Sequence, residues 1–193
     1  MDKKSDKLQV TSYELPTLEQ LLEAGVHFGH QSRRWHPKIE PYLYKEQNKI
    51  HIFDLIKTHQ KLTEAAEFLY QSAKEGKLIC FVGTKKQASE IVKKASIGAG
   101  AFYMCERWTG GMITNFDHVS NKMRRLKKIE EGLDFGGQYE NYTKKERLDL
   151  ERELEKLEEE VGGVRNMEKI PDVLFAVDIK RESTAVKEAH DRD

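Results

Sequence analysis

The sequence predicts an α/β fold in which helices cover both faces of a parallel sheet, with a helical hairpin inserted between two βαβ units. Two continuous apolar runs of strand length, residues 77–83 (KLICFVG) and 172–178 (DVLFAVD), are typical of buried parallel strands. A helical segment follows each run, and strands that alternate with helices form parallel βαβ units. Residues 114–163 carry two apolar stripes at helical spacing, which predict the insertion.

A short helix is predicted near the N-terminus, after a leader at residues 1–16 that we expect to be mobile. Thr17 has the hydroxyl of a helix N-cap, and Gln20 stands three positions later, where a capping box has its second partner. Gly25 follows and can adopt the backbone conformation that ends a helix. Residues 17–25 therefore predict the first helix.

A β-hairpin and a longer helix are predicted next. Residues 25–38 (GVHFGHQSRRWHPK) are interrupted by a glycine and a proline, so we expect irregular chain there. Residues 42–44 and 50–53 have the composition of short strands, and residues 47–48 (Gln-Asn) supply turn chemistry. Asp54 can cap the following helix, whose apolar residues recur at helical spacing.

The α/β part continues through alternating segments. Residues 84–100 predict a helix that ends in glycines, residues 101–108 a strand, and residues 181–192 a polar helix. The predicted division is a leader (1–16), an α/β domain (17–113 and 164–193) and a coiled-coil insertion (114–163).

The insertion is predicted as two amphipathic helices joined by a glycine-containing loop. The first begins near Thr114 or Asn115, which can cap it, and the second follows a capping box of Thr143 and Glu146. Their apolar stripes are Phe116, Val119, Met123, Leu126 and Ile129 on the first helix, and Leu150, Leu154, Leu157 and Val161, at heptad spacing, on the second. The stripes favour an antiparallel coiled-coil hairpin, and a helix pair packed flat on the sheet is the alternative.

Composition excludes several classes of protein. Of the 193 residues, 38% are hydrophobic and 34% are charged, which indicates a strongly charged globular chain. No apolar run reaches the roughly 18 residues of a membrane span, and the N-terminus has no apolar region of a signal peptide. Cys80 and Cys105 stand in apolar stretches without a CxxC pair, so we expect buried thiols in a cytosolic protein.

The net charge of zero conceals two opposed blocks. Residues 85–128 contain ten Lys or Arg and three Asp or Glu, a net charge of +7. Residues 131–160 contain five basic and eleven acidic residues, a net charge of −6. The first block can meet phosphates and the second repels them, so the distribution of charge permits a nucleic-acid partner.

Histidines in residues 25–38 raise the question of a metal site. His27 and His30 are three positions apart and His36 is near, a spacing that could serve zinc. Zinc needs further ligands at set spacing, and the sequence has no HExxH motif and no cysteine close by. His27 and His30 are thus only weak candidates for metal ligands, and no cofactor is predicted.

A strand-to-helix turn at residues 81–87 (FVGTKKQ) could hold a phosphate. A helix beginning after Gly83 would offer free N–H groups, with Lys85 and Lys86 beside them. The sequence has neither the Walker A spacing nor GxGxxG, which argues against a nucleotide-binding enzyme. Such an enzyme is therefore kept only as the alternative hypothesis. The same groups could bind a nucleic-acid phosphate or form a purely structural turn.

A second dense stretch, residues 106–116 (ERWTGGMITNF), follows a predicted strand at its carboxyl end, where open α/β sheets place ligand sites. Its glycine pair lets the backbone approach a partner closely. We expect Arg107 to make contacts with a ligand and Trp108 to belong to the core.

Basic and aromatic residues at chain corners favour binding of structured RNA over catalysis. The sequence has no GxSxG nucleophile, and its acidic residues concentrate on the second insertion helix, where a solvated face is expected. A coiled-coil adaptor that acts through the insertion alone is a third interpretation. The residues predicted to contact RNA are His30, Arg33, Arg34, Trp35, Lys38, Lys85, Lys86, Arg107, Arg124, Arg125 and Lys128.

Five motifs occur together in one order and spacing. They are LLEAGVHFGHQSRRWHPK (21–38), HIFDLIKT (51–58), FVGTKKQA (81–88), ERWTGGMITNF (106–116) and IPDVLFAVDIKRE (170–182). In this combination the chain, from about Thr17 to its end, closely resembles the bacterial type of the small-subunit ribosomal protein S2 family.

The resemblance implies a flavodoxin-like α/β domain with a protruding coiled-coil hairpin and no enzymatic activity. It implies a structural constituent of the small ribosomal subunit, in translation, that binds small-subunit ribosomal RNA between head and body. It also implies contacts with neighbouring small-subunit proteins, including ribosomal protein S1, on cytoplasmic ribosomes, with no membrane and no small-molecule substrate. His27, His30, Arg33, Arg34 and Trp35 match the corner motif of the family.

The sequence departs from the family pattern in four places. The leader is longer than in a minimal member, His36 stands where asparagine is common, and Thr109 stands where leucine is common. Family members also continue beyond the position of Asp193 with another strand and a final helix. We therefore expect an apolar sheet edge and face to be exposed, unless a partner covers them.

Overall fold

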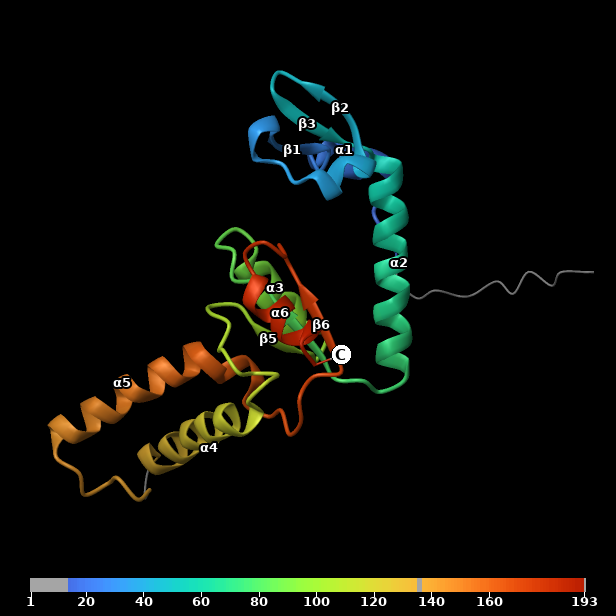
Figure 1. Ribbon diagram of the computed structural model, residues 1–193. Coiled ribbons are helices and arrows are strands. Elements are labelled where there is room, and N and C mark those ends of the chain that lie inside the picture. The colour runs from blue at the N-terminus through green and yellow to red at the C-terminus, as the bar shows by residue number, and fades with distance from the viewer. Residues whose placement is uncertain (1–13, 135–136, 193) are drawn as a thin grey trace, which may run out of the picture. The chain divides into compact units, whose positions relative to one another are not determined.

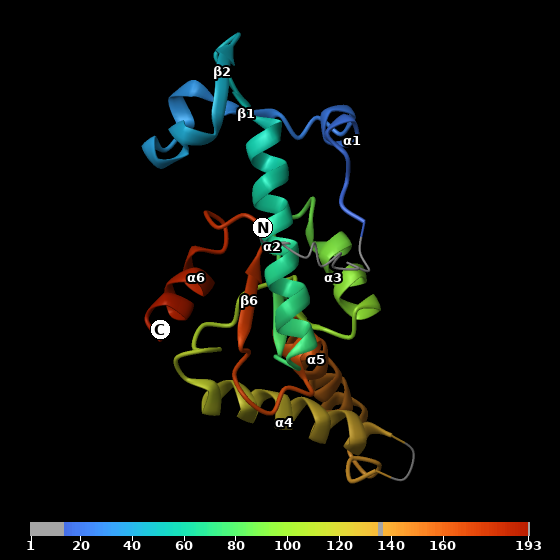
Figure 2. The ribbon, with the colours of Figure 1, turned by 90° about the vertical axis from the view of Figure 1, so that its right-hand side faces the viewer.

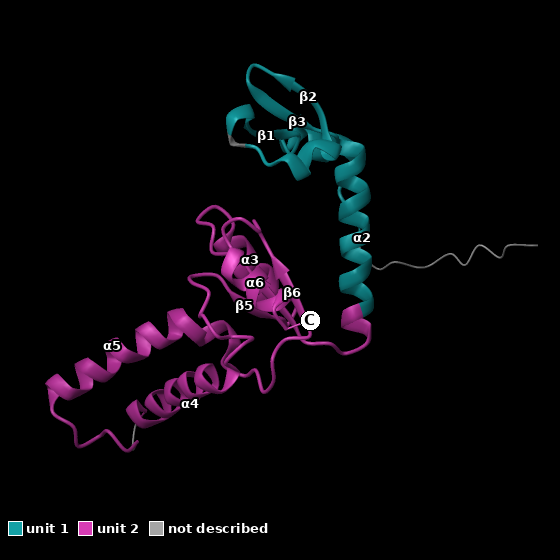
Figure 3. Cartoon of the chain, in the orientation of Figure 1, with its two compact units in different colours: residues 1–71 teal, residues 72–193 magenta. Residues whose placement is uncertain are grey.

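The computed structural model describes residues 14–134 and 137–192, which form two compact units (Figure 3). The first unit extends to Gln71, and the second begins at Ser72. Most of the predicted leader lies outside the described residues. Each unit has its own three-stranded sheet, antiparallel in the first and parallel in the second.

The first unit combines helix α1 (Leu18–Glu23), an antiparallel sheet and most of helix α2 (Leu55–Lys74) (Figure 1). The predicted capping box of α1 is confirmed, since the Gln20 backbone N–H donates to Thr17 Oγ1 at 3.2 Å and the Thr17 N–H donates to Gln20 Oε1 at 2.9 Å. The predicted cap of α2 is also confirmed, because the Ile56 N–H donates to Asp54 Oδ1 at 2.9 Å.

The sheet of the first unit has the order β1-β3-β2, with strands β1 (Phe28–Gln31), β2 (Leu43–Gln47) and β3 (Ile50–Phe53). The β2–β3 hairpin is confirmed, but its turn lies at Asn48 and Lys49, whose φ angles of 53° and 61° suit a two-residue turn with left-handed residues. Short 3-10 helices at Ser32–Arg34 and Pro37–Tyr42 precede the hairpin.

One prediction for this unit is wrong, because residues 28–31 form a strand and not irregular chain. Strand β1 pairs antiparallel with β3, with Phe28 opposite Ile52. The glycine that suggested a loop permits this pairing, since a Cβ on Gly29 would lie 2.9 Å from the carbonyl oxygen of His51. A close approach of two backbones, and not a chain break, accounts for Gly29.

The second unit confirms the predicted parallel sheet with helices. Its strands are β4 (Ile79–Val82), β5 (Phe102–Met104) and β6 (Val173–Ala176), in the spatial order β5-β4-β6. The first of these strands in the chain is central, which matches the beginning of the flavodoxin-like order 2-1-3-4-5. Helices α3 (Ser89–Gly98) and α6 (Ser183–His190) lie on opposite sides of the sheet (Figure 2).

The core of the second unit joins one sheet face to α6 and to the inserted helices. Cys80 and Val82 are fully buried on β4, and Met104 and Ala185 pack in the same cluster. Both cysteines are buried free thiols, as predicted. Burial raises the pKa of Cys80 to about 12 and the pKa of Cys105 to about 11, so neither thiol ionises near neutral pH.

The predicted helix at residues 84–100 and the predicted strand at residues 101–108 are both markedly shorter in the structure. Helix α3 begins at Ser89, five residues later than predicted, and strand β5 ends at Met104 instead of residue 108. In both places a distant glutamate forms a hydrogen bond, Glu182 with the Thr84 backbone N–H and Glu188 with the Trp108 indole, and these contacts are invisible to local sequence patterns.

Helices α4 (Phe116–Leu133) and α5 (Lys144–Val161) form at both predicted places and pack antiparallel to each other (Figure 1). The ion pairs Lys122–Glu160, at 2.6 Å, and Arg125–Glu153, at 2.8 Å, connect them. The capping box at residues 143–146 is confirmed. The buried members of the two apolar stripes are Val119, Met123, Leu126, Ile129, Leu157 and Val161.

Asn115 occupies the N-cap position of α4, as predicted, but its side chain forms no capping hydrogen bond. The chain before this helix is held from elsewhere, by α6. The coiled-coil geometry of the helix pair stays a prediction.

Candidate nucleic-acid interface

A buried carboxylate organises the loop between β5 and α4. Glu188 lies on α6 and is 9% exposed. The Trp108 indole N–H and the Gly111 backbone N–H donate to its Oε1 at 3.1 and 2.9 Å. The Ile113 N–H donates to Oε2 at 3.1 Å, and the backbone and hydroxyl of Thr114 donate to the same oxygen at 3.4 and 3.3 Å.

These donors keep Glu188 ionised. Burial by itself raises the pKa of this carboxyl, but the hydrogen bonds from Gly111, Trp108, Ile113 and Thr114 outweigh burial and hold the pKa below its ordinary value. The carboxylate is therefore the form that the loop stabilises.

Two further contacts hold the same loop. The Thr109 hydroxyl donates to the Glu160 carbonyl oxygen at the end of α5, at 2.9 Å. Arg192 Nη1 donates to the Ile113 carbonyl oxygen at 2.8 Å. Trp108 is buried, as expected, whereas the Arg107 side chain is exposed at the beginning of the loop.

The turn after β4 is occupied by the chain's own carboxylates. The Thr84 backbone N–H and hydroxyl both donate to Glu182 Oε1, at 2.8 and 2.7 Å. Lys85 Nζ pairs with Asp178 Oδ2 at 2.9 Å, and this lysine holds the pKa of Asp178 below its ordinary value. The phosphate-cradling turn considered as an alternative is wrong in its geometry, because α3 does not begin after Gly83 and the Thr84 donors are taken.

Of the two lysines of this turn, Lys86 has its side chain exposed. Lys85 is half-buried and engaged with Asp178, so it would have to leave that carboxylate to meet an RNA phosphate. The two neighbouring lysines thus differ in what they can offer to a ligand.

In the first unit, the residues predicted to contact RNA gather within one short segment, residues 30–38, here named the corner. His30, Arg33 and Lys38 are exposed, and Trp35 is 41% exposed with its ring centroid 5.3 Å from that of His51. Arg34 lies in the 3-10 helix, and its side chain lies outside the described residues.

The backbone of the corner is held by local contacts. Arg33 Nε donates to Gln31 Oε1 at 3.2 Å, and the Lys38 N–H donates to His36 Nδ1 at 3.2 Å. His36 thereby serves as the N-cap of the second 3-10 helix, a role that asparagine also performs.

The two weak candidates for metal ligands are placed differently. His27 is half-buried with its ring centroid 4.0 Å from that of Phe28, and His30 is exposed on β1. Within residues 14–134 and 137–192, no three side chains of the His, Cys, Asp or Glu type are arranged to hold a metal ion.

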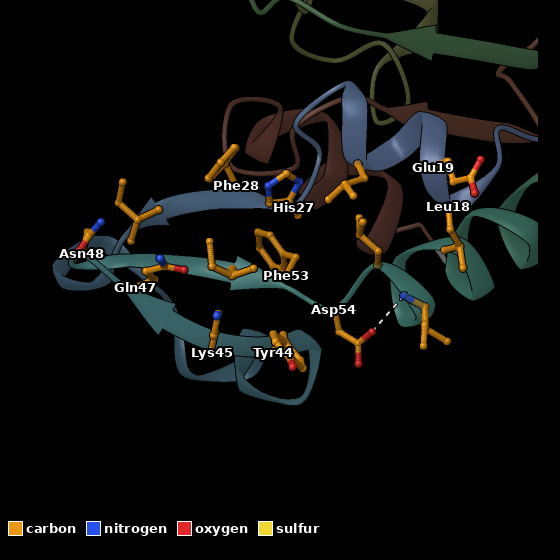
Figure 4. Close-up of a pocket in the computed structure, with 15 residues that line it drawn as sticks. Leu18, Glu19, His27, Phe28, Tyr44, Lys45, Gln47, Asn48, Phe53 and Asp54 are labelled. Carbon is orange, nitrogen blue, oxygen red and sulfur yellow. Dashed lines mark hydrogen bonds between the residues drawn. The ribbon is translucent and has the colours of Figure 1, made fainter.

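An apolar hollow of about 700 Å³ lies between α1, the sheet and the beginning of α2 in the first unit (Figure 4). This hollow was not predicted from the sequence, although the alternation of apolar residues in the hairpin is a signal for an apolar sheet face at this place. Because its walls are aliphatic and aromatic, it suits an apolar group and not a phosphate. The apolar residues that line it are Leu18, Leu22, Phe28, Tyr44, Ile50, Ile52, Phe53, Leu55 and Ile56.

On α4 the predicted contact residues differ in availability. Arg125 forms two hydrogen bonds of 2.8 Å with Glu153, which raise the pKa of the guanidinium, so it links the two helices. Arg124 is exposed, and its Nη2 donates to Asn121 Oδ1 at 2.8 Å. Lys128 is exposed. The exposed acidic residues of α5 include Asp149, Glu151, Glu155 and Glu159.

His30, Arg33, Trp35 and Lys38 are thus all exposed within one segment of nine residues in the first unit. In the second unit the exposed cations stand on three separate elements, and two of the predicted residues, Lys85 and Arg125, are engaged in ion pairs. Sequence reasoning missed Glu182 and Glu188, because nothing local distinguishes them from the other acids of a polar helix.

Comparison with known proteins identifies the family of this chain. The family model described as ribosomal protein S2 matches residues 21–193. A protein of Dictyoglomus thermophilum named small ribosomal subunit protein uS2 is 52% identical over 173 residues, which are 90% of this chain and 70% of the relative. A uS2c protein of Guillardia theta is 51% identical over 89% of this chain and 73% of its own length, and a uS2 protein of Fusobacterium nucleatum is 46% identical over 90% and 70%.

The family consists of ribosomal proteins and not of enzymes, which confirms the prediction of a structural and non-enzymatic protein. Among the described residues, no helix is both long and apolar enough to span a membrane. The family model covers most of the sequence, and the relatives share about half of its residues. The chain therefore belongs to the ribosomal protein S2 family.

Proposed function

We propose that this protein is a structural constituent of the small ribosomal subunit that binds small-subunit ribosomal RNA between head and body. It acts on cytoplasmic ribosomes and helps to dock neighbouring small-subunit proteins, including ribosomal protein S1. The names of its relatives support the ribosomal role, since each of them is a small ribosomal subunit protein.

The corner is the observation that carries RNA binding. Arg33 and Lys38 are exposed cations that can meet phosphates, and Trp35 presents a partly exposed indole on which an unpaired base can stack. His30 can donate to a base edge or a ribose, and Arg34 adds a further cation. A cation–aromatic–cation segment that connects two strands of a sheet suits structured RNA.

A second RNA surface belongs to the other unit. We assign to it Lys86, Arg107, Arg124 and Lys128, which are exposed, with Lys85 and Arg125 contributing only if their ion pairs open. The α4–α5 pair is proposed as a coiled-coil arm, inserted at 114–163 into an α/β domain of residues 17–113 and 164–193. Its acidic face on α5 repels RNA and so is assigned to contacts with proteins.

Incorporation into ribosomal subunits tests this function. The labelled chain is offered to small subunits stripped of their own S2 protein, and co-sedimentation is measured at increasing salt. The wild type should co-sediment in about equimolar amount, and an Arg33→Ala/Lys38→Ala variant should be released at lower salt, with a weaker salt dependence. Lys145→Ala, which removes an exposed cation of α5, is the matched control. Equal retention of the corner variant and the control would refute the corner as an RNA contact.

A further inference from the structure

The loop at residues 108–114 has an unusual internal organisation. It contains no helix or strand, yet four of its residues direct hydrogen-bond donors at one carboxylate, Glu188 of α6. Gly111 makes this possible, because its φ of +85° is a conformation that other residues rarely adopt.

The position of this loop matters for both flanking segments. Arg107 immediately precedes it, and α4, which carries Arg124 and Lys128, begins two residues after it. A loop without regular secondary structure does not fix the orientation of the segments on either side of it. The direction of Arg107 and of the first turn of α4 therefore depends on the contacts that hold the loop.

The carboxylate is chemically suited to this task. An ionised carboxylate only accepts hydrogen bonds and has about four acceptor positions on two oxygens. Oε1 receives the Trp108 and Gly111 donors, and Oε2 receives those of Ile113 and Thr114. A glutamine would keep one accepting oxygen but would turn an NH2 group towards the remaining donors, so half of the arrangement would be lost.

We propose that Glu188 is a positioning residue for RNA binding, which acts by holding the 108–114 loop and thereby directing Arg107 towards the RNA. This inference rests on the proposed function. Glu188 is buried and lies on a different element from every residue predicted to contact RNA, so it acts through them and touches no RNA itself.

A double-mutant cycle in RNA affinity tests the inference. The variants are Glu188→Gln, Arg107→Ala and their combination, with Glu155→Gln as the control that removes the same charge from an exposed site on α5. Binding to purified small-subunit ribosomal RNA is measured over a range of salt. Each of Glu188→Gln and Arg107→Ala should weaken binding about tenfold, since a hydrogen-bonded charged contact is lost.

The combination distinguishes positioning from a general loss of stability. If Glu188 acts through Arg107, the double variant should bind no more weakly than Arg107→Ala alone, and both should lower the salt slope by roughly one phosphate contact. The inference would be overturned if the losses of affinity in Glu188→Gln and Arg107→Ala multiplied in the double variant, or if Glu188→Gln bound RNA as tightly as the wild type. Combining Glu188→Gln with Arg33→Ala should instead give effects that multiply.

Hydrogen exchange in the free protein separates this inference from the proposed function. The amides of Gly111 and Ile113 should exchange much faster in Glu188→Gln than in the wild type, while those of β4 remain protected. Unchanged protection of the two loop amides would refute the inference whatever the RNA result. Absence of RNA binding by the wild type would instead refute the proposed function, and the positioning role with it.

Trp108→Phe is a second variant in case Glu188→Gln folds poorly. It removes one donor to Glu188 Oε1 and keeps a large aromatic ring in the core. The expected loss of RNA affinity is two- to threefold, again absent when Arg107 is alanine. An equal loss in both backgrounds would contradict the proposed route.

Discussion

The corner in the first unit and the 108–114 loop in the second are both irregular segments next to candidate RNA-binding residues, but they are held in opposite ways. The corner depends on bonds within its own segment and to the neighbouring hairpin, where Gln31 pairs with Ile50 and Ser32 bonds to Lys49, 17 residues away. The loop depends on bonds to Glu160 and Glu188, which lie 51 to 80 residues away in sequence.

Because of this difference, substitutions in the two segments should affect RNA binding and folding stability differently. The functional side chains of the corner are exposed, and none of those that the structure describes belongs to the core of the first unit. Substitutions in the corner should therefore reduce RNA binding and leave folding intact. The loop buries Trp108, Met112 and Ile113 in or beside the core, so its substitutions should affect both properties.

The largest expected effect follows from Glu188→Ala. It leaves the donors of Trp108, Gly111 and Ile113 buried without an acceptor, and an unsatisfied buried donor costs about 1–3 kcal/mol. Since water can enter the space in part, we expect a loss of about 3 kcal/mol in the free energy of unfolding. Urea denaturation followed by circular dichroism measures it, with Glu155→Ala expected within about 0.5 kcal/mol of the wild type.

The same carboxylate predicts a pH dependence. The pKa of Glu188 is lower in the folded chain than its ordinary value of 4.5, so its stabilising contribution is present above that pH and is lost as the pH falls through the folded pKa. The stability difference between the wild type and Glu188→Gln should therefore shrink below pH 4.5. A difference that stays constant down to acid unfolding would contradict this account of the loop.

The second effect tests the corner. Replacing Trp35 with alanine removes a stacking surface, and a base–aromatic stack contributes about 1–3 kcal/mol, so affinity for small-subunit ribosomal RNA should fall about tenfold. The indole is 41% exposed, so the free energy of unfolding should change by less than about 1 kcal/mol. Filter binding and urea denaturation of the same preparation give both numbers. A variant that loses stability but not affinity would make Trp35 a core residue.

The comparison also explains what could be predicted from the sequence. The capping boxes at Thr17 and Thr143, the hairpin and the apolar strand β4 depend on neighbours in sequence, and all were predicted. Strand β1 was missed because Gly29 has the same appearance in a loop and at a close contact between strands.

The candidate site shows the same division. Exposed cations at Arg33 and Arg107 follow from composition and position, since long charged side chains rarely bury. That Lys85 and Arg125 are held by Asp178 and Glu153 could not be predicted, because each partner comes from a distant segment with many alternative acids. Glu188 is the extreme case, since it stands between Lys187 and Ala189 in a short helix and nothing in this local sequence marks it as buried.

A smaller effect is expected at the second anchor of the loop. Thr109→Val keeps the shape of the side chain but removes the hydroxyl that donates to the Glu160 carbonyl oxygen. Thr109 is 7% exposed, so the loss should cost about 1 kcal/mol of unfolding free energy. Thr63→Val is the matched control, because its hydroxyl donates to a helical carbonyl on an exposed surface. Equal effects at the two sites would show that the anchor at Thr109 adds nothing to the loop.

The smallest effect is expected at His36, in the corner. His36 departs from the family pattern, but its Nδ1 accepts the Lys38 N–H as the cap of a short 3-10 helix, and an asparagine oxygen can accept the same bond. His36→Asn should therefore change the free energy of unfolding by less than about 0.5 kcal/mol, whereas His36→Ala should lose most of the cap, about 1 kcal/mol. Thermal unfolding of the three proteins measures the order. If asparagine proved as damaging as alanine, the imidazole would contribute more than its cap, and the corner would depend on contacts beyond its own segment, as the 108–114 loop does.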